Sequence, residues 1–236
     1  VCFKPLGVIL AVMPWNFPLW QVFRFAAPAL MVGNVGVLKH SSNVTGCSLA
    51  IQKVFQEAGF PDNVFVSLLA SSNKVEGIIN NENIKAVTLT GSTPAGMSVA
   101  ALAGKKLKKT VLELGGSDPY IILDDADLEK TVEACITGRL PNGGQSCIAA
   151  KRFIVVDKIY SDFVELLTQK MSEKKMGDPF DEANFIGPQA RKDLRDELHT
   201  QVVKSIEKGA KPVLGCEIPS MKGAYYYPSI LTEVTK

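Results

Sequence analysis

Short apolar runs alternate with longer helical patterns through the first half of the chain. Runs rich in Val, Ile, Leu and Thr predict strands at 7–12, 35–39, 64–69, 85–90 and 110–114. Between these runs, apolar spacing predicts helices at 19–31, 44–58, 74–79 and 94–103. Nearly continuous apolar strands joined by helices are typical of a parallel sheet covered on both faces. The pattern therefore predicts a doubly wound α/β domain over residues 1–115, with ligands at the carboxyl ends of its strands.

A second block follows the glycine pair at 115 and 116. Its pattern predicts strands at 120–123 and 153–156 and helices at 161–175 and 189–208. We expect residues 116–236 to form part of a second α/β domain. The predicted fold class is thus α/β, with a parallel-sheet domain followed by an incomplete second domain.

Composition and charge narrow the range of partners. With 46% hydrophobic residues, 236 residues can bury a large core. Lys and Arg (26) nearly balance Asp and Glu (24), and no basic run is interleaved with aromatics, which argues against nucleic acid or a membrane as partner. The first residues lack the features of a signal peptide, and the apolar runs are too short to span a membrane. We expect a cytoplasmic protein that acts on small molecules.

Five cysteines carry the first candidate chemistry. They form neither metal-binding pairs nor an even-numbered framework, which favours a reducing compartment and no metal site. A lone cysteine is usually a small buried hydrophobe, and we expect this of Cys2, Cys47, Cys135 and Cys216. Cys147 differs, because Asn142-Gly143-Gly144-Gln145 before it predicts a turn that exposes both its sulfur and its backbone N–H. Cys147 is the candidate nucleophile.

Two polar side chains stand in apolar settings. Glu113 lies in the strand 110–114, 34 positions before Cys147. Burial there would make it a better general base, although an edge-strand glutamate facing water is the alternative. Asn16 lies between Trp15 and Phe17, where a rigidly held amide could stabilise developing negative charge. An ordinary turn asparagine is the competing interpretation.

The segment Thr90-Gly91-Ser92-Thr93-Pro94-Ala95-Gly96 follows a predicted strand and opens a predicted helix. The usual G-x-G-x-x-G fingerprint is absent, but glycine permits close backbone approach and the helix N-terminus offers N–H groups to a phosphate. An ordinary helix start capped by Thr93 is the alternative.

The neighbourhoods of Cys147, Glu113 and Asn16 resemble the nucleophile, general-base and oxyanion motifs of the aldehyde dehydrogenase superfamily, along nearly all of the chain. Gln145, Cys147, Lys151 and Arg152 match the family's pattern around the nucleophile, whereas Pro141 and Gly143 depart from it. The resemblance implies that the Cys147 thiolate attacks an aldehyde and that Asn16 and the Cys147 N–H hold the oxyanion. Glu113 would then activate water against the resulting thioester.

The same resemblance implies a Rossmann-like domain that binds NAD or NADP. Its Lys39 would lie against the adenosine ribose, and Ser42 stands where many NAD-preferring members carry a glutamate. Without that charge, a 2′-phosphate should meet less repulsion and NADP should be accepted. We expect His40 to be a surface or cofactor-side residue and His199 to be solvated. The implied cofactor-binding residues are Pro14, Trp15, Lys39, Ser42, Gly91, Ser92 and Leu114.

Within the hydrolytic branch that Glu113 favours, the chain is similar to succinate-semialdehyde dehydrogenases. In that group an arginine eight residues after the amide binds the distal carboxylate of the substrate, and Arg24 holds this position. A structural salt bridge is the alternative for Arg24. A second arginine that some members carry six residues before the nucleophile is here Pro141.

Subunits of this superfamily are about twice as long, so the chain is interpreted as the central part of a longer subunit, with a homodimer or homotetramer expected for the whole. A non-catalytic relative, or a fragment, is one alternative. A thiol hydrolase with His40 or His199 as its base is another.

Overall fold

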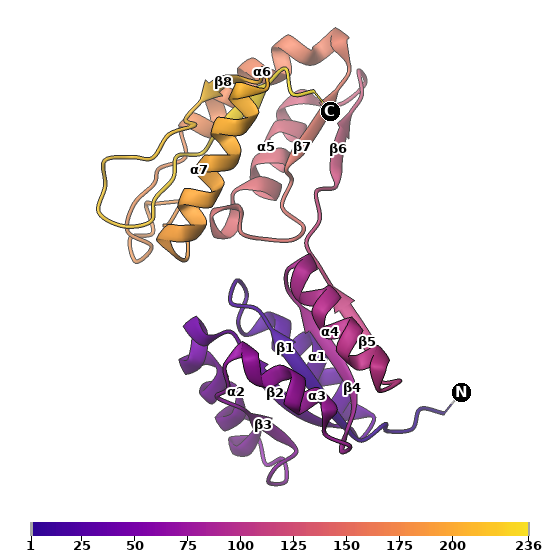
Figure 1. The fold of residues 1–236 in the computed structure, drawn as a ribbon. Helices are drawn as coiled ribbons and strands as arrows, with labels where there is room; N and C mark the ends of the chain where they lie inside the picture. Colours follow the sequence, from indigo (N-terminus) through magenta and orange to yellow (C-terminus); the bar gives the residue numbers. More distant parts are fainter. Residues whose placement is uncertain (1, 236) are drawn as a thin grey trace. The chain divides into compact units, whose positions relative to one another are not determined.

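The computed structural model describes residues 2–235 and divides into two compact units, Val1–Gly115 and Gly116–Lys236 (Figure 1). Each unit has its own sheet and its own buried apolar clusters. The boundary falls at the glycine pair that follows the last strand of the first unit.

The first unit contains five parallel strands in the order β3-β2-β1-β4-β5. The strands are β1 (Val8–Met13), β2 (Val35–His40), β3 (Phe65–Ser67), β4 (Ile84–Thr90) and β5 (Lys109–Glu113). They are joined by α1 (Trp20–Met31), α2 (Thr45–Glu57), α3 (Val75–Asn80) and α4 (Thr93–Lys105), with short 3₁₀ turns η1 (Ser42–Val44) and η2 (Ser72–Lys74). Because the chain starts in the middle of the sheet and winds outward in both directions, the sheet is doubly wound. The predicted fold class is confirmed, and only β3 is clearly shorter than predicted.

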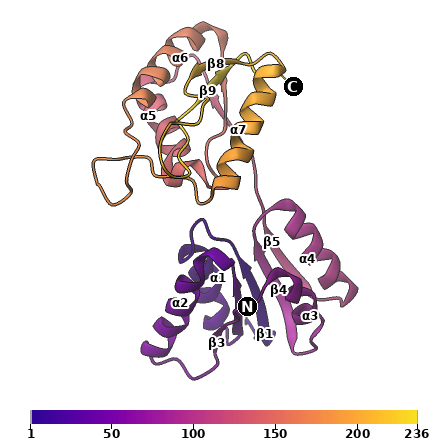
Figure 2. The ribbon, with the colours of Figure 1, turned by 60° about the vertical axis from the view of Figure 1, so that its left-hand side comes forward.

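Both faces of this sheet are packed (Figure 2). Leu10 of β1 belongs to the cluster that α3 and α4 cover, whereas its neighbour Ala11 belongs to the cluster that α1 and α2 cover. Successive side chains of a strand point to opposite faces. The continuous apolar run of β1 therefore serves two cores at once.

The second unit is built on two parallel strands, β6 (Pro119–Ile122) and β7 (Arg152–Val155). The helices α5 (Leu128–Arg139) and α6 (Asp157–Ser172) pack against them, with the buried side chains of Val132, Ile136, Phe163 and Leu167 in the core. The 3₁₀ turn η3 (Pro141–Gly144) follows α5. The remaining elements are α7 (Lys192–Glu207) and the antiparallel pair β8 (Lys211–Leu214) and β9 (Ile230–Thr232).

Prediction was less complete in this unit. The two predicted strands lie within one residue of β6 and β7, and the two predicted helices overlap α6 and α7. The sequence did not predict α5, whose apolar stripe is short, or the small pair β8 and β9, whose strands are held by each other. None of the helices between residues 2 and 235 has the length and apolar character needed to cross a membrane.

Candidate active site

The five parallel strands of the first unit end at the same edge of the sheet. Met13 pairs in register with His40, and Thr90 pairs with Glu113. Since the strands are parallel, the segments that leave their carboxyl ends gather at this edge. They carry all the site residues predicted in this unit except Arg24, which lies on α1: Pro14, Trp15, Asn16, Lys39, Ser42, Gly91, Ser92, Glu113 and Leu114.

The turn between β4 and α4 presents a helix N-terminus at this edge. The cap of α4 is Ser92, whose hydroxyl accepts a 3.4 Å hydrogen bond from the Ala95 N–H; the alternative that named Thr93 as cap is wrong by one residue. A Cβ atom added to Gly96 would lie 2.5 Å from Cδ2 of Leu114, so glycine lets the helix approach the end of β5 without a shift of the Leu114 side chain. Backbone N–H groups in the first turn of α4 can therefore face a phosphate near Gly91.

The end of β2 supplies a cation and a group of hydroxyls. Lys39 is half-buried, and this burial lowers the pKa of its ammonium group. Its ammonium makes no hydrogen bond or ion pair with the part of the chain that the structure describes. Beside it, a cavity of about 260 Å³ is lined by hydroxyl-bearing residues, namely Ser41, Ser42, Thr45, Ser48 and Ser71.

His40 holds the turn that carries Asn16. The ring is 5% exposed, and its Nε2 lies 3.0 Å from the carbonyl oxygen of Pro18 while its Nδ1 lies 3.0 Å from the backbone nitrogen of Ser41. The expectation of a surface residue is therefore wrong, whereas that of a cofactor-side residue stays a prediction, since His40 also lines the hydroxyl-bearing cavity. As the last residue of β2, His40 points inward beneath the chain that leaves β1, where an imidazole can satisfy backbone groups.

Arg24 and Glu113 meet in the first unit. Arg24 Nη2 lies 3.7 Å from Glu113 Oε2, with the side chains 42% and 52% exposed. Both residues line a cavity of about 530 Å³ beside α1, on the face of the sheet over β4 and β5. The expected burial of Glu113 is thus not seen. Glu113 is the last residue of the edge strand β5, where its carboxylate reaches solvent beside Arg24.

The predicted turn before Cys147 is present in the second unit. After α5 ends at Arg139, the backbone is left-handed at Asn142, Gly143 and Gly144, with φ of 55°, 62° and 74°. A Cβ atom at Gly144 would also lie 2.9 Å from Cζ of Arg139, whose burial lowers the pKa of its guanidinium. Glycine is therefore required at Gly144 by both conformation and space. Cys147 follows, half-buried and with a free thiol.

Two glutamine side chains fasten this turn. Gln145 donates a 2.8 Å hydrogen bond to the Asn142 carbonyl and accepts a 2.9 Å bond from the Ala190 N–H. Gln189 donates a 3.1 Å bond to the Gly143 carbonyl. The sequence motif pointed to Gln145, but nothing pointed to Gln189, which is remote in sequence from Cys147.

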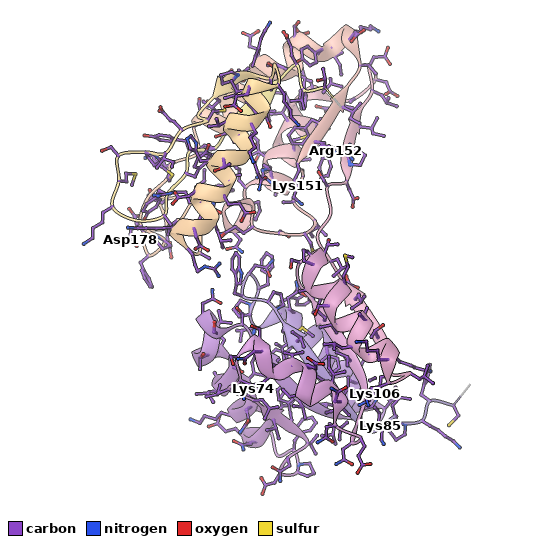
Figure 3. The ribbon with its side chains drawn as sticks, viewed as in Figure 1. Lys74, Lys85, Lys106, Lys151, Arg152 and Asp178 are labelled. Carbon is purple, nitrogen blue, oxygen red and sulfur yellow. The ribbon has the colours of Figure 1, made fainter. Side chains whose placement is uncertain are left out.

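Lys151, which directly precedes β7 and is labelled in Figure 3, holds the other side of the turn. Lys151 Nζ donates to the carbonyl oxygens of Gly116 (2.5 Å), Cys147 (3.1 Å) and Ser146 (3.3 Å). Burial and then the Arg139 guanidinium lower the pKa of Lys151, whereas the charges of Cys147 and Asp118 raise it. The motif contained Lys151 without indicating this role.

The predictions for the remaining cysteines and for His199 are confirmed only in part. Cys135 and Cys216 are buried as predicted, and burial raises the pKa of the Cys135 thiol to about 11. The expectation is wrong for Cys2, which is exposed ahead of β1, and Cys47 is only partly covered. His199 is half-buried rather than solvated, with Nδ1 3.1 Å from the Tyr226 hydroxyl. No group of three or more His, Cys, Asp or Glu side chains within residues 2–235 is arranged to hold a metal ion.

The sequence model of the aldehyde dehydrogenase family matches residues 1–236. The chain belongs to the aldehyde dehydrogenase family. Among curated relatives of this chain, succinate-semialdehyde dehydrogenase (NADP+) 1 of Mycobacterium ulcerans is 53% identical over 234 residues, which cover 99% of this chain and 51% of the relative. The corresponding enzyme of Mycobacterium leprae is 50% identical over the same share of each chain.

Solved structures agree with the family assignment. Succinic semialdehyde dehydrogenase from Streptococcus pyogenes, in complex with NADP+, matches this chain with a TM-score of 0.96 and 40% identity, over 99% of this chain and 51% of that one. Succinate-semialdehyde dehydrogenase from Burkholderia pseudomallei matches with a TM-score of 0.95 and 30% identity, over 98% and 48%. The chain therefore spans about half the length of the relatives that it matches.

Proposed function

We propose that this chain is part of an NADP-accepting aldehyde dehydrogenase that oxidises succinate semialdehyde to succinate. The observation that carries the proposal is the half-buried Cys147 thiol at the end of a glycine turn fastened by Gln145, Gln189 and Lys151. A thiol held in this way, with the Lys151 ammonium bonded to the carbonyl of the same residue, has the environment of a reactive cysteine. We assign cofactor binding to residues 1–115 and the nucleophile to residues 116–236.

In the proposed reaction, the Cys147 thiolate forms a bond to the aldehyde carbon and the carbonyl oxygen takes the negative charge. The Asn16 amide and the Cys147 N–H donate hydrogen bonds to that oxygen. NADP, when bound, accepts the hydride that leaves the carbon, and a thioester remains on Cys147. Glu113 accepts a proton from water, the water oxygen attacks the thioester, and the acid leaves as the thiolate is restored.

The carboxyl edge of the first unit fits a dinucleotide phosphate. Backbone N–H groups at the start of α4 suit the pyrophosphate, and Lys39 has a cation without an acidic partner among the described residues. Ser42 lines the hydroxyl-bearing cavity in a place where a carboxylate would repel a 2′-phosphate. These features support NADP as a cofactor, and the M. ulcerans and S. pyogenes relatives are named for it.

Arg24 is the proposed partner of the distal carboxylate. Its present partner, Glu113, gives an ion pair with both side chains about half exposed, and such a pair contributes about 0–1 kcal/mol. A substrate carboxylate bound by a less exposed arginine contributes roughly 2–5 kcal/mol when one partner is truncated. Exchange of Glu113 for the substrate on Arg24 is therefore energetically feasible.

The test is to trap the acyl intermediate in the intact protein. Cys147→Ala should abolish aldehyde oxidation, and Glu113→Gln should stop turnover chiefly at hydrolysis, so that mass spectrometry finds a succinyl group on Cys147. Cys47→Ala, which changes another partly covered thiol, is the matched control and should retain activity. Turnover without Cys147, or an adduct on Cys135, would refute the assigned roles.

A general aldehyde dehydrogenase is the second candidate. The Arg24–Glu113 contact favours it, since it gives Arg24 a structural partner within the first unit. Equal efficiency on succinate semialdehyde and on butanal, which lacks the carboxylate, would support this candidate.

A further inference from the structure

Lys151 contacts three backbone carbonyl groups. Two of them belong to the peptide groups on either side of the Cys147 Cα atom. The ammonium lies 3.3 Å from the Ser146 oxygen and 3.1 Å from the Cys147 oxygen, and its third contact is the Gly116 oxygen. We propose that Lys151 is a positioning residue that fixes the two peptide planes on either side of Cys147, and so directs its backbone N–H toward the oxyanion. The inference rests on the proposed function and deepens it.

Peptide planarity connects this cation to the oxyanion donor. The Ser146 carbonyl and the Cys147 N–H belong to one planar trans peptide and point in opposite directions. Holding the Ser146 oxygen on the side of Lys151 therefore turns the Cys147 N–H to the other side. The contact with the Cys147 oxygen holds the following peptide plane as well. With both planes held, the backbone torsions of Cys147 have little freedom.

Regular secondary structure does not fix the backbone conformation at Cys147. Cys147 lies between η3 and β7, outside any helix or strand. Ala149 donates a 3.2 Å hydrogen bond to the Ser146 oxygen, but across residues 2–235 the Cys147 N–H itself donates none. Hydrogen bonds from a charged donor are stronger than those between neutral groups. Lys151 thus adds charged hydrogen bonds at Cys147 itself, beyond those with which Gln145 and Gln189 fasten the preceding turn.

Lys151 is itself anchored. Its bond to the Gly116 oxygen ties it to the segment that leads into β6, and the next residue, Arg152, donates a 2.8 Å bond from Nε to the Ser117 oxygen. Arg152 shares this anchoring role but has no contact with the carbonyls of Ser146 or Cys147. The chain therefore offers a matched comparison between two adjacent cations.

Charge adds to the geometric restraint. Although burial and Arg139 lower the pKa of Lys151, negative charge at Cys147 raises it. A cation at this place would also stabilise the oxyanion that forms on the substrate, and the held backbone sets the direction of the Cys147 side chain.

The test compares Lys151→Met, Lys151→Arg and Arg152→Met in the intact protein. Loss of a well-placed oxyanion donor, or a misplacement of about 1 Å, lowers kcat by roughly 100- to 1000-fold. Because Lys151 acts through the backbone, Lys151→Met should reduce kcat at least about tenfold and leave KM within about twofold. Alkylation of Cys147 by iodoacetamide, followed on its peptide by mass spectrometry, should slow in the same variant. Lys151→Arg should restore both quantities, and Arg152→Met should leave the alkylation rate unchanged.

Several results would overturn the inference. The first is an unchanged kcat in Lys151→Met, and the second is a Lys151→Arg variant as impaired as Lys151→Met. The third is an equal slowing of alkylation in Arg152→Met. Any of these would show that Lys151 is only a stabilising contact. If Lys151→Met does not fold, Lys151→Gln, a neutral donor, is expected to change kcat in the same direction and is judged by the same outcomes. Turnover by Cys147→Ala would instead refute the proposed function, and the alkylation rates do not depend on that result.

Discussion

The sharpest prediction concerns Arg24→Ala. If Arg24 binds the distal carboxylate, wild-type protein should prefer succinate semialdehyde to butanal, and the substitution should remove most of that preference. Butanal has the same chain length without the carboxylate, so it isolates the contribution of this one contact. The slow oxidation of butanal should persist, because Cys147, Glu113 and Asn16 are unchanged.

The structure sets the size of the effect. Truncating one partner of a buried carboxylate contact costs roughly 2–5 kcal/mol, but the Arg24 side chain is 42% exposed, which favours the lower end. Binding must also displace Glu113 from its 3.7 Å contact, at a cost of about 0–1 kcal/mol. The net preference is then about 1–3 kcal/mol, or roughly fivefold to a hundredfold in kcat/KM.

The assay measures kcat/KM for both aldehydes in wild-type protein and in Arg24→Ala. Removing Arg24 also removes a cation beside Glu113, which should change the butanal value by no more than about fivefold, the equivalent of 1 kcal/mol. Arg24→Lys, which keeps the charge but loses the planar fork, should retain only part of the preference. An equal loss on both substrates would refute the reasoning and leave Arg24 as a structural partner of Glu113.

Three further predictions follow from single sites. Ser42→Glu should shift preference from NADP toward NAD, measured as the ratio of the two kcat/KM values, because a new carboxylate repels the 2′-phosphate. Gly96→Ala should lower the free energy of unfolding by about 1–3 kcal/mol in thermal or denaturant unfolding, because its Cβ would lie 2.5 Å from Leu114, and the cost should be smaller beside Leu114→Ala. Cys135 is 1% exposed, and burial raises its pKa from 9.0 to about 11 on folding. The free energy of unfolding should therefore be unaffected by this group below pH 9 and fall by up to about 2–3 kcal/mol between pH 9 and 11. The fall should be smaller in Cys135→Ala.

Each of these has a clear contrary result. An unaltered cofactor ratio would remove Ser42 from the site, and an unchanged unfolding midpoint for Gly96→Ala would show that Leu114 moves aside freely. The same slope of stability against pH with and without Cys135 would assign the alkaline loss to other groups.

The sequence by itself determined the alternation of strands and helices in the first unit and the positions of the candidate thiol, carboxylate and amide. Strand and helix periodicity are properties of neighbouring residues, so β1, β2, β4 and their helices could be predicted closely. Elements whose sequence signal is weak, or that depend on distant residues, were not predicted. The helix α5 has a short apolar stripe, and β8 and β9 exist through their pairing with each other.

Tertiary structure alone decided what surrounds the candidate residues. It left Glu113 beside Arg24 on an edge strand, placed His40 under the turn that carries Asn16, and brought Gln189 and Lys151 onto the turn around Cys147. Burial and hydrogen bonding depend on which distant segments meet, and no local pattern records that. Chemistry-bearing side chains can therefore be identified from sequence, whereas their partners and exposure follow only from the packed fold.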